Sequence, residues 1–241
     1  MPRIFIPKAD LSAGSMEVTG EDHRHLAFSL RMKPGEDVTV CDGNGNDIRC
    51  KIASVASDRT VLIPLEEKPC ENEPPFPLTL FQALPKGEKT DWIIQKSVEF
   101  GVCEIGFFQG ERSVARLAVG EIAKKRDRWQ KIADGAARQC GRGILPQISV
   151  LSFRDALAKA AEGPAFFCHC GGEALPLPSF LKRLSSPSRL SFFVGPEGGF
   201  SDGEVYAARS AGLPLVSLGN RILRCESASL FTLACIAYEF E

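Results

Sequence analysis

Two glycine-containing segments near the C-terminal end place the strongest constraint on how this chain can fold. Residues 192–200 read FFVGPEGGF, and residues 218–226 read LGNRILRCE. Each segment follows a short apolar run and precedes a helical pattern, so each is expected at a strand-to-helix turn. Ligands of open α/β sheets bind beyond the carboxyl ends of the strands. We therefore expect the two turns to lie on neighbouring strands and to line one pocket.

The chain from residue 78 onward alternates between strand-like and helical patterns. Strands are predicted at residues 78–83, 104–108, 165–168, 190–194 and 213–217, and helices at 91–100, 121–140, 153–162, 177–184 and 226–240. A further helix begins at the S-x-x-E capping box of residues 201–204 and ends at Gly212. This alternation predicts an α/β domain with a mostly parallel sheet and helices on both faces.

The N-terminal part has a different pattern, with short strands separated by turns. Residues 38–41 and 48–52 alternate between apolar and polar types, and the intervening DGNG predicts a hairpin. A small β-barrel follows from this pattern. The proline-rich stretch ENEPPFP at residues 71–77 indicates a boundary. We therefore expect two domains, residues 1–72 and residues 73–241.

Composition excludes several classes of protein. No apolar stretch approaches the roughly 20 residues that span a bilayer, and no secretory signal is present, so we expect no membrane association. The nine cysteines are odd in number and include no C-x-x-C, which argues against a disulfide framework and favours a reduced, cytoplasmic protein. Net charge is −1, yet residues 111–143 hold nine Lys/Arg against four Asp/Glu. That stretch could be a solvated helix face or could neutralise RNA phosphates.

The glycine segments lack the signatures of common nucleotide-binding loops. Neither the lysine and Ser/Thr of a P-loop nor the G-x-G-x-x-G spacing is present. Three glycines still allow the backbone to approach a ligand closely, which suits a compact, largely neutral group such as adenosine. Ile222 and Leu223 offer apolar contact to a base ring, and the Leu218 and Gly219 backbones offer hydrogen bonds. Plain structural turns remain the alternative for either segment taken alone.

Several motifs together resemble one known family. GPEGGFS at residues 195–201 and LGNRILRCESA at 218–228 are accompanied by the shorter motifs LPKG (84–87), KSVEFGV (96–102), ERSV (111–114), QCGR (139–142), HL (25–26) and LRMKPG (30–35). In their order along the chain they resemble the bacterial 16S rRNA uridine-N3 methyltransferase family, which belongs to the SPOUT superfamily. The resemblance covers nearly the whole chain. It departs from the family at Ser227, where threonine is usual, and at Phe100, where leucine is usual.

The resemblance implies a fold, a cofactor and partners. Such enzymes have an N-terminal PUA-like β-barrel and a C-terminal SPOUT domain with a trefoil knot, and they work as homodimers. They transfer a methyl group from S-adenosyl-L-methionine (AdoMet) to N3 of one uridine in 16S rRNA of the small ribosomal subunit. Cofactor-binding residues carried over from the motifs are Gly195, Pro196, Glu197, Gly198, Gly199, Leu218, Gly219, Ile222, Leu223, Arg224 and Ser227.

The catalytic candidates lie in these motifs, and the RNA-binding candidates lie in the basic stretch and in the small barrel. Glu226 could act as base or orienting acceptor if burial raises its pKa, or it could be a helix N-terminal carboxylate that interacts with the dipole. Arg224 or Arg31 could stabilise negative charge that develops on the uracil carbonyls. The RNA-binding candidates are Arg24, Arg31, Arg112, Arg138 and Arg142.

Further predictions concern a metal site, the burial of the last helix and the substrate. Cys168, His169 and Cys170 are too few to bind zinc without further ligands, so no metal is expected, although His169 could border the pocket. Residues 227–238 are apolar nearly all round, which predicts burial on all sides, by the knot and a twofold partner or within a monomer. A knotted methyltransferase acting on tRNA or a ribose 2′-hydroxyl, and a non-catalytic RNA-binding assembly factor, remain alternative functions.

Overall fold

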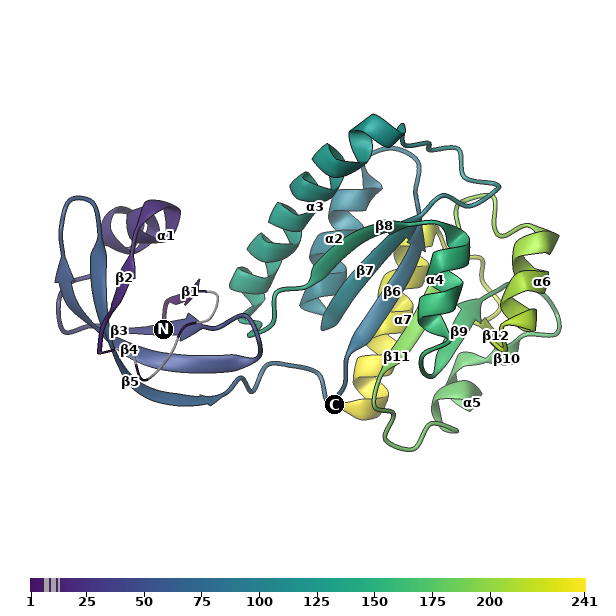
Figure 1. Cartoon of the computed structure of the whole chain (residues 1–241). Helices are drawn as coiled ribbons and strands as arrows, with labels where there is room; N and C mark the ends of the chain where they lie inside the picture. Colours follow the sequence, from purple (N-terminus) through teal and green to yellow (C-terminus); the bar gives the residue numbers. More distant parts are fainter. Residues whose placement is uncertain (7–8, 10–11, 13) are drawn as a thin grey trace. The chain divides into compact units, whose positions relative to one another are not determined.

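The chain forms two compact units in the computed structural model, which describes residues 1–241 apart from 7–8, 10–11 and 13. The first unit comprises residues 1–73 with 137–145, and the second comprises residues 74–136 with 146–241 (Figure 1). The sequence gives no signal that residues 137–145 belong with the first unit, because they continue a helix that begins in the second.

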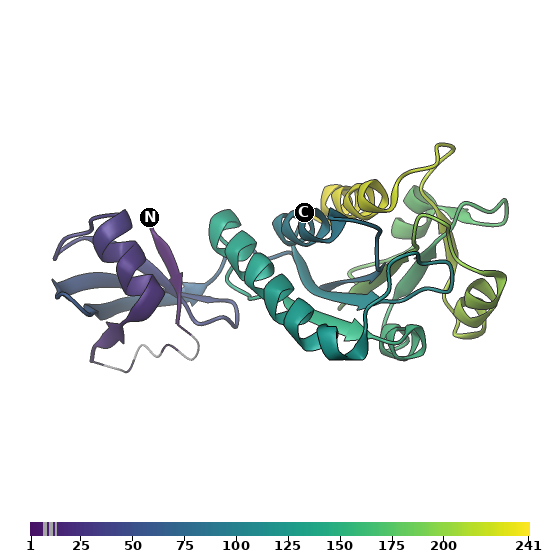
Figure 2. The ribbon, with the colours of Figure 1, turned by 90° about the horizontal axis from the view of Figure 1, so that it is seen from above.

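The first unit is built on a five-stranded sheet that curls into a half-barrel. Its strands are β1 (Arg3–Phe5), β2 (Met16–Val18), β3 (Asp37–Cys41), β4 (Asn46–Val55) and β5 (Thr60–Pro69), in the order β1-β3-β4-β5-β2. The short helix α1 (Gly20–Arg24) continues into a π-helix, η1 (His25–Ser29). Figure 2 shows this helical segment lying over the sheet, where Leu26 is fully buried in the core.

The predicted hairpin of the first unit is confirmed. Strands β3 and β4 pair antiparallel across the turn of residues 42–45. The Asp42 carboxylate accepts hydrogen bonds from the backbone N–H groups of Asn44 (2.7 Å) and Asn46 (3.0 Å), which stabilises the turn. Gly43 and Gly45 both have positive φ (80° and 99°), a conformation that favours glycine.

Arg142, expected to bind RNA, is instead buried within the first unit. It is 2% exposed, and its guanidinium pairs with the Glu73 carboxylate at 2.7 Å. That carboxylate also accepts from the backbone N–H groups of Gly143 (2.7 Å) and Ile144 (3.0 Å). The charge of this arginine is therefore already paired inside the protein, which disfavours the predicted phosphate contact.

The second unit is a seven-stranded, wholly parallel sheet, which confirms the predicted fold class. Its strands are β6 (Leu78–Ala83), β7 (Val102–Phe108), β8 (Gln147–Leu151), β9 (Ala165–Cys168), β10 (Leu175–Pro176), β11 (Leu190–Val194) and β12 (Leu215–Ser217). The helices are α2 (Lys89–Glu99), α3 (Val119–Cys140), α4 (Phe153–Ala160), α5 (Leu177–Leu181), α6 (Asp202–Ser210) and α7 (Cys225–Phe240). The strand order is β10-β12-β9-β11-β6-β7-β8. Strands β8 and β10, at the two edges, were not predicted.

Alternating phenylalanines divide the helices between the two faces of this sheet. On one face Phe81 and Phe193 stack 4.7 Å apart, in a core that includes residues of α4 and α6. On the other face Phe166 contacts Phe180 of α5, and Phe107 contacts Trp129 of α3. Helix α7 lies on this second face beside α2 (Figure 2). The helices thus cover both faces, as predicted.

The two glycine segments do not follow neighbouring strands. Strand β9 pairs with both β11 and β12 and separates them. The expectation of adjacency is wrong because β9 precedes both strands in the chain but is inserted between them in the sheet. The carboxyl end of β9, with His169, therefore lies between the two glycine turns.

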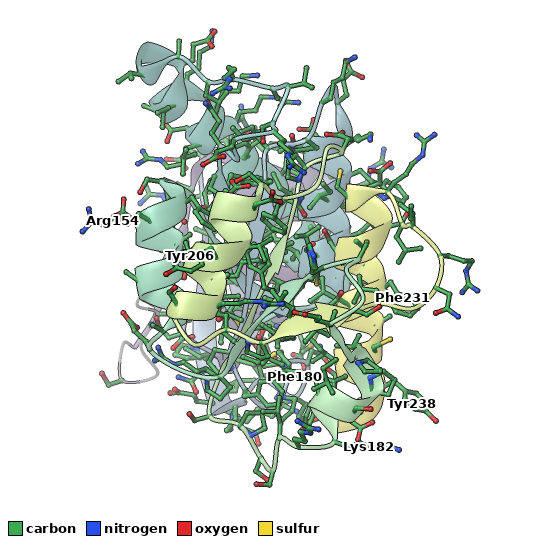
Figure 3. All side chains as sticks on the ribbon, turned by 90° about the vertical axis from the view of Figure 1, so that its right-hand side faces the viewer. Arg154, Phe180, Lys182, Tyr206, Phe231 and Tyr238 are labelled. Carbon is green, nitrogen blue, oxygen red and sulfur yellow. The ribbon has the colours of Figure 1, made fainter. Side chains whose placement is uncertain are left out.

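Helix α7 is only partly buried within one chain, so the alternative of full burial in a monomer is wrong, and burial by a twofold partner stays a prediction. Its inner face includes the fully buried Ser229, whose hydroxyl donates to the Gln82 side chain of β6 at 2.5 Å. An outer stripe of Ser227, Phe231, Ala234 and Tyr238 remains exposed. Figure 3 shows Phe231 and Tyr238 projecting from this helix.

Among the described residues, no helix is both long and apolar enough for a bilayer span. The trefoil knot stays a prediction.

We predict that Arg142→Ala lowers the free energy of unfolding by about 3 kcal/mol, because it leaves the Glu73 carboxylate buried without its cation. The matched control is Arg138→Ala. Arg138 pairs with Asp22 at 3.1 Å but is 42% exposed, so its loss should cost less than about 1 kcal/mol. Urea denaturation of both variants measures the difference. Equal, small effects would contradict a structural role for Arg142.

Candidate functional site

A cavity of about 480 Å³ opens at the carboxyl ends of β9, β11 and β12. Both glycine segments contribute to its wall, as predicted from their place at strand-to-helix turns. Predicted binding residues that line it are Gly195, Pro196, Glu197, Gly199, Leu218, Gly219, Ile222, Leu223 and Arg224. The two segments are therefore parts of one site.

Two predicted binding residues do not line this cavity. Gly198 lies against the loop after β7, where an added Cβ would be 3.2 Å from the Cβ of Arg112. Ser227 is exposed in the first turn of α7. Gly198 therefore permits close packing between two loops, and Ser227 belongs to the outer stripe of the helix.

The first glycine segment packs tightly against one of its own side chains, Phe200. A Cβ at Gly195 would lie 3.0 Å from the Phe200 ring, closer than real Cβ contacts normally are. Gly199 has φ +68°, and its N–H donates to the Pro196 carbonyl at 2.8 Å. The wall made by this segment is therefore largely backbone, which lets a ligand approach closely.

Glu204 connects this segment to the loop after β7. The predicted capping box is confirmed: the Ser201 hydroxyl accepts from the Glu204 N–H, and a Glu204 carboxylate oxygen accepts from the Ser201 N–H at 2.7 Å. Its other oxygen accepts from the Glu111 N–H at 3.0 Å. The next residue, Arg112, lines the cavity. A helix cap thus also positions a cation at the site.

Three arginines give the cavity wall a positive charge. Arg112 comes from the loop after β7, and Arg221 and Arg224 come from the second glycine segment. All three are exposed, as is Ile222, whose side chain is 88% exposed. Gly219, with φ +114°, turns the chain at the start of this segment. The wall thus combines apolar and cationic side chains, an arrangement suited to a nucleobase and a polyanion.

Lys89, which the sequence analysis did not select, joins the two glycine segments. It stands at the start of α2, and its ammonium lies 3.1 Å from a carboxylate oxygen of Glu197 and 3.1 Å from one of Glu226. The Glu197 carboxylate also accepts from the Lys86 N–H at 3.0 Å. The position of Lys89 in the sequence could have identified it, because Lys89 follows the loop after β6, at the same sheet edge as the cavity.

The carboxylates of this cluster are stabilised in their charged form. Burial alone raises the pKa of Glu226, but hydrogen bonds from its own N–H and the Cys225 thiol, together with Lys89, outweigh it and lower the pKa overall. For Glu197, burial likewise raises the pKa, and hydrogen bonds from its own N–H, the Lys86 N–H and Lys89 lower it overall. The raised pKa that a base role for Glu226 required is therefore absent.

Cys225 is a second residue that the sequence analysis did not select. Its buried thiol lines the cavity and donates to a Glu226 carboxylate oxygen at 3.2 Å. Burial, followed by the two nearby carboxylates, raises the pKa of Cys225 to about 12. At neutral pH it is therefore a neutral hydrogen-bond donor and not a thiolate nucleophile.

The segment after β9 closes the cavity between the glycine segments. Cys168, His169 and Cys170 all line it, as the position of His169 at a strand end suggested. Burial, and secondarily Arg209, lowers the pKa of His169, which keeps the ring neutral at pH 7. In the part of the chain that the structure describes, no cluster of three or more His, Cys, Asp or Glu residues could hold a metal.

The remaining candidates belong to the first unit. Arg24 and Arg31 are exposed, and Arg31 has a positive φ of 54°, unusual for a non-glycine residue. Arg138, at the end of α3, pairs with Asp22. These three side chains are available at the surface of the unit, whereas Arg142 is not.

Comparisons with known proteins agree with this geometry. Residues 72–237 match the family described as RNA methyltransferase domain, and residues 18–65 match the RNA methyltransferase PUA domain. The chain is similar to the ribosomal RNA small subunit methyltransferase E of Bacillus subtilis, at 33% identity, covering 95% of this chain and 92% of the relative. It is 32% identical to the protein of that name from Synechocystis, covering 97% of this chain and 76% of the relative.

A solved structure is similar over the whole length of the chain. It is a ribosomal RNA small subunit methyltransferase E from Neisseria gonorrhoeae, crystallised bound to S-adenosyl methionine. The TM-score is 0.86 at 33% identity, with 99% of this chain and 97% of that chain covered.

We predict that Lys89→Met destabilises the protein by roughly 1 kcal/mol at neutral pH, a modest effect because the ion pairs are partly exposed. The lowered pKa values of Glu197 and Glu226 mean that their contribution is present above the ordinary carboxyl value of 4.5 and is lost as pH falls. The difference from wild type should therefore shrink on acidification, as measured by urea unfolding at several pH values.

Lys96→Met is the matched control for this prediction. Lys96 lies on the same helix and pairs with Glu99 at 2.8 Å. Neither residue lines the cavity. A Lys89→Met effect that is independent of pH would contradict the role assigned to the two carboxylates.

Proposed function

Because the chain belongs to the ribosomal RNA small subunit methyltransferase E family, we propose that it transfers a methyl group from AdoMet to N3 of one uridine in 16S rRNA. The observation that supports this most strongly is the single cavity formed by the two glycine segments. Its residues coincide with the motifs that distinguish the family in the sequence. The enzyme would act in the cytoplasm, where ribosomal subunits are assembled.

The residues of the cavity fit AdoMet. A volume of about 480 Å³ lies within the range of small-molecule sites. Neither Gly199 nor Gly219 has any atom within 4 Å of an added Cβ, so their walls leave room for a ligand. Ile222 and Leu223 would contact the adenine ring, and the backbone of the first glycine segment would hold the rest. When bound, the cofactor supplies an electrophilic methyl group on a sulfonium.

The protein's own contribution concerns the uracil. N3 carries a proton and is a weak nucleophile until that proton leaves, and the resulting negative charge spreads to the two neighbouring carbonyl oxygens. Arg224, on the cavity wall, is positioned to donate to one of them, with Arg112 and Arg221 adding positive charge. This favours loss of the proton to solvent, and a fixed orientation toward the methyl group contributes further acceleration.

Glu226 is better suited to positioning than to proton abstraction. Its lowered pKa makes it a weak base, and it is already bound to Lys89 and Cys225. We assign it, with Glu197, to holding the two glycine segments at a fixed separation. Arg31 is exposed in the first unit and is proposed to contact RNA from there.

RNA phosphates would be bound by exposed cations of both units. Those of helix α3 are Lys124, Lys125, Arg126, Arg128 and Lys131. Arg24, Arg31, Arg112 and Arg138 would add to them, whereas Arg142 is excluded by its burial. Contacts of this kind give salt-dependent affinity without sequence choice.

A homodimer is proposed through the outer stripe of α7. Phe231 is 40% exposed and Tyr238 is 91% exposed, in a helix that otherwise carries few polar side chains. A second copy covering this stripe would bury both rings (Figure 3). The N-terminal turn of α7 lies at the cavity, so dimer formation and the site are structurally linked.

We predict that Arg224→Ala lowers methyl transfer to small-subunit rRNA by about a hundredfold, the effect expected from losing one donor to developing charge. The control is Arg154→Ala, which removes an exposed arginine from α4, on the other face of the sheet. Mass mapping of rRNA from cells lacking the chain should show loss of one base-methylated uridine. Wild type and Arg154→Ala should restore it, and Arg224→Ala should not. An unchanged methylation pattern in those cells would contradict the proposal.

We predict that replacing both Phe231 and Tyr238 by Glu converts the protein to monomers, because two charges would be placed in an apolar interface. Sedimentation equilibrium measures the mass. Tyr206→Glu, at a 74% exposed aromatic of α6, should leave the dimer intact. A wild-type protein that sediments at monomer mass would show that α7 is not an interface.

A further inference from the structure

The segment of residues 24–31 is the most irregular part of the first unit. Helix α1 passes into the π-helix η1 (His25–Ser29), and Arg31 follows with a φ of 54°. π-helical turns are rare and occur frequently at functional sites, and left-handed backbone at a non-glycine residue costs free energy. Leu26, fully buried in the sheet core, fixes the inner side of this segment. Its outer side is therefore held in an unusual conformation.

That conformation presents a large aromatic ring to solvent. Phe28 is 61% exposed. Its ring lies 5.7 Å from the His23 ring, with the two planes at 77°. His23 is 3% exposed, and its Nδ1 lies 2.9 Å from the Thr60 hydroxyl. The Phe28 ring thus contacts a side chain that is fixed in the interior, while most of its own surface stays open.

Cations flank this ring along the chain. Arg24 precedes it, and Arg31 and Lys33 follow, all with exposed side chains. Of the nearby carboxylates, Asp22 is paired with Arg138 at 3.1 Å. Within the described residues, neither Arg24 nor Arg31 forms an ion pair. An exposed aromatic ring beside free cations is complementary to a nucleotide, whose base stacks and whose phosphate is anionic.

We propose that Phe28 is a stacking platform for one unpaired base of the substrate RNA, with Arg24 and Arg31 binding the adjoining phosphates. The identity of the RNA rests on the proposed function, but the platform is a separate site from the cavity. It lies within residues 18–65, which match an RNA methyltransferase PUA domain. Single-stranded RNA is commonly bound by stacking its bases on aromatic side chains. A protein partner would not require the flanking arginines to be unpaired.

The test uses the full-length protein and a single-stranded oligoribonucleotide that contains 2-aminopurine, whose fluorescence falls when it stacks. Phe28→Ala should weaken binding about tenfold and remove the fluorescence change, in keeping with the loss of one stacked base. Phe28→Trp should retain both. Tyr206→Ala, at an exposed aromatic of the second unit, should behave as wild type. Unchanged melting temperatures would confirm that each variant folds.

Two results would overturn the proposal. One is a Phe28→Ala variant that binds and quenches the oligonucleotide as wild type does. The other is a variant that binds this RNA normally but loses affinity for protein-containing small subunits, which would make Phe28 a protein contact. Calorimetric titration with AdoMet should be unaffected by Phe28→Ala. Failure of the wild type to bind AdoMet would contradict the proposed function. The stacking proposal would still be decided by the binding and fluorescence of the oligonucleotide.

Discussion

The ion pairs of Lys89 with Glu197 and Glu226 hold the site together. Each carboxylate comes from a different glycine segment, and each lies 3.1 Å from the same ammonium group. Without that cation the two carboxylates would repel each other at a partly buried sheet edge. The three side chains are only partly exposed, so the attraction is less screened than at a fully solvated surface. One cation thus links the two segments that line the cavity.

The arrangement around Lys89 assigns separate roles to the charges of the site. The two carboxylates share one cation, Lys89, and their pKa values are lowered, so they stay charged and serve structure. The arginines of the wall remain exposed, so they are free to meet an anionic substrate. A chain of net charge −1 can thus present a positive site for RNA. The same division explains why Arg142, paired inside the first unit, does not take part.

Much of the fold could be predicted because local pattern determines it. Apolar runs rich in phenylalanine identify β9 and β11, and the S-x-x-E box identifies the start of α6. Strand order could not be predicted, since the insertion of β9 between β11 and β12 is a long-range pairing without a local signal. The edge strands β8 and β10 were missed because β8 has a single buried position and β10 has only two residues. The amino-acid composition of α7 could not show that its outer stripe is exposed, because apolar residues occur both in protein cores and at interfaces.

The site was predicted where motifs specify backbone, and missed where it depends on contacts between distant side chains. The glycine segments were found because glycine and proline constrain the chain locally. Lys89 was missed because its partners Glu197 and Glu226 lie far away in sequence. Cys225 donates to its neighbour Glu226, and it was missed because no local pattern signals its burial at the cavity. The most direct test of the central claim is calorimetric titration of AdoMet into wild type, Lys89→Met and Lys96→Met. We expect Lys89→Met to lose at least about tenfold in affinity and Lys96→Met to match wild type. Wild-type affinity in Lys89→Met would contradict the claim that this lysine holds the two segments around one cavity.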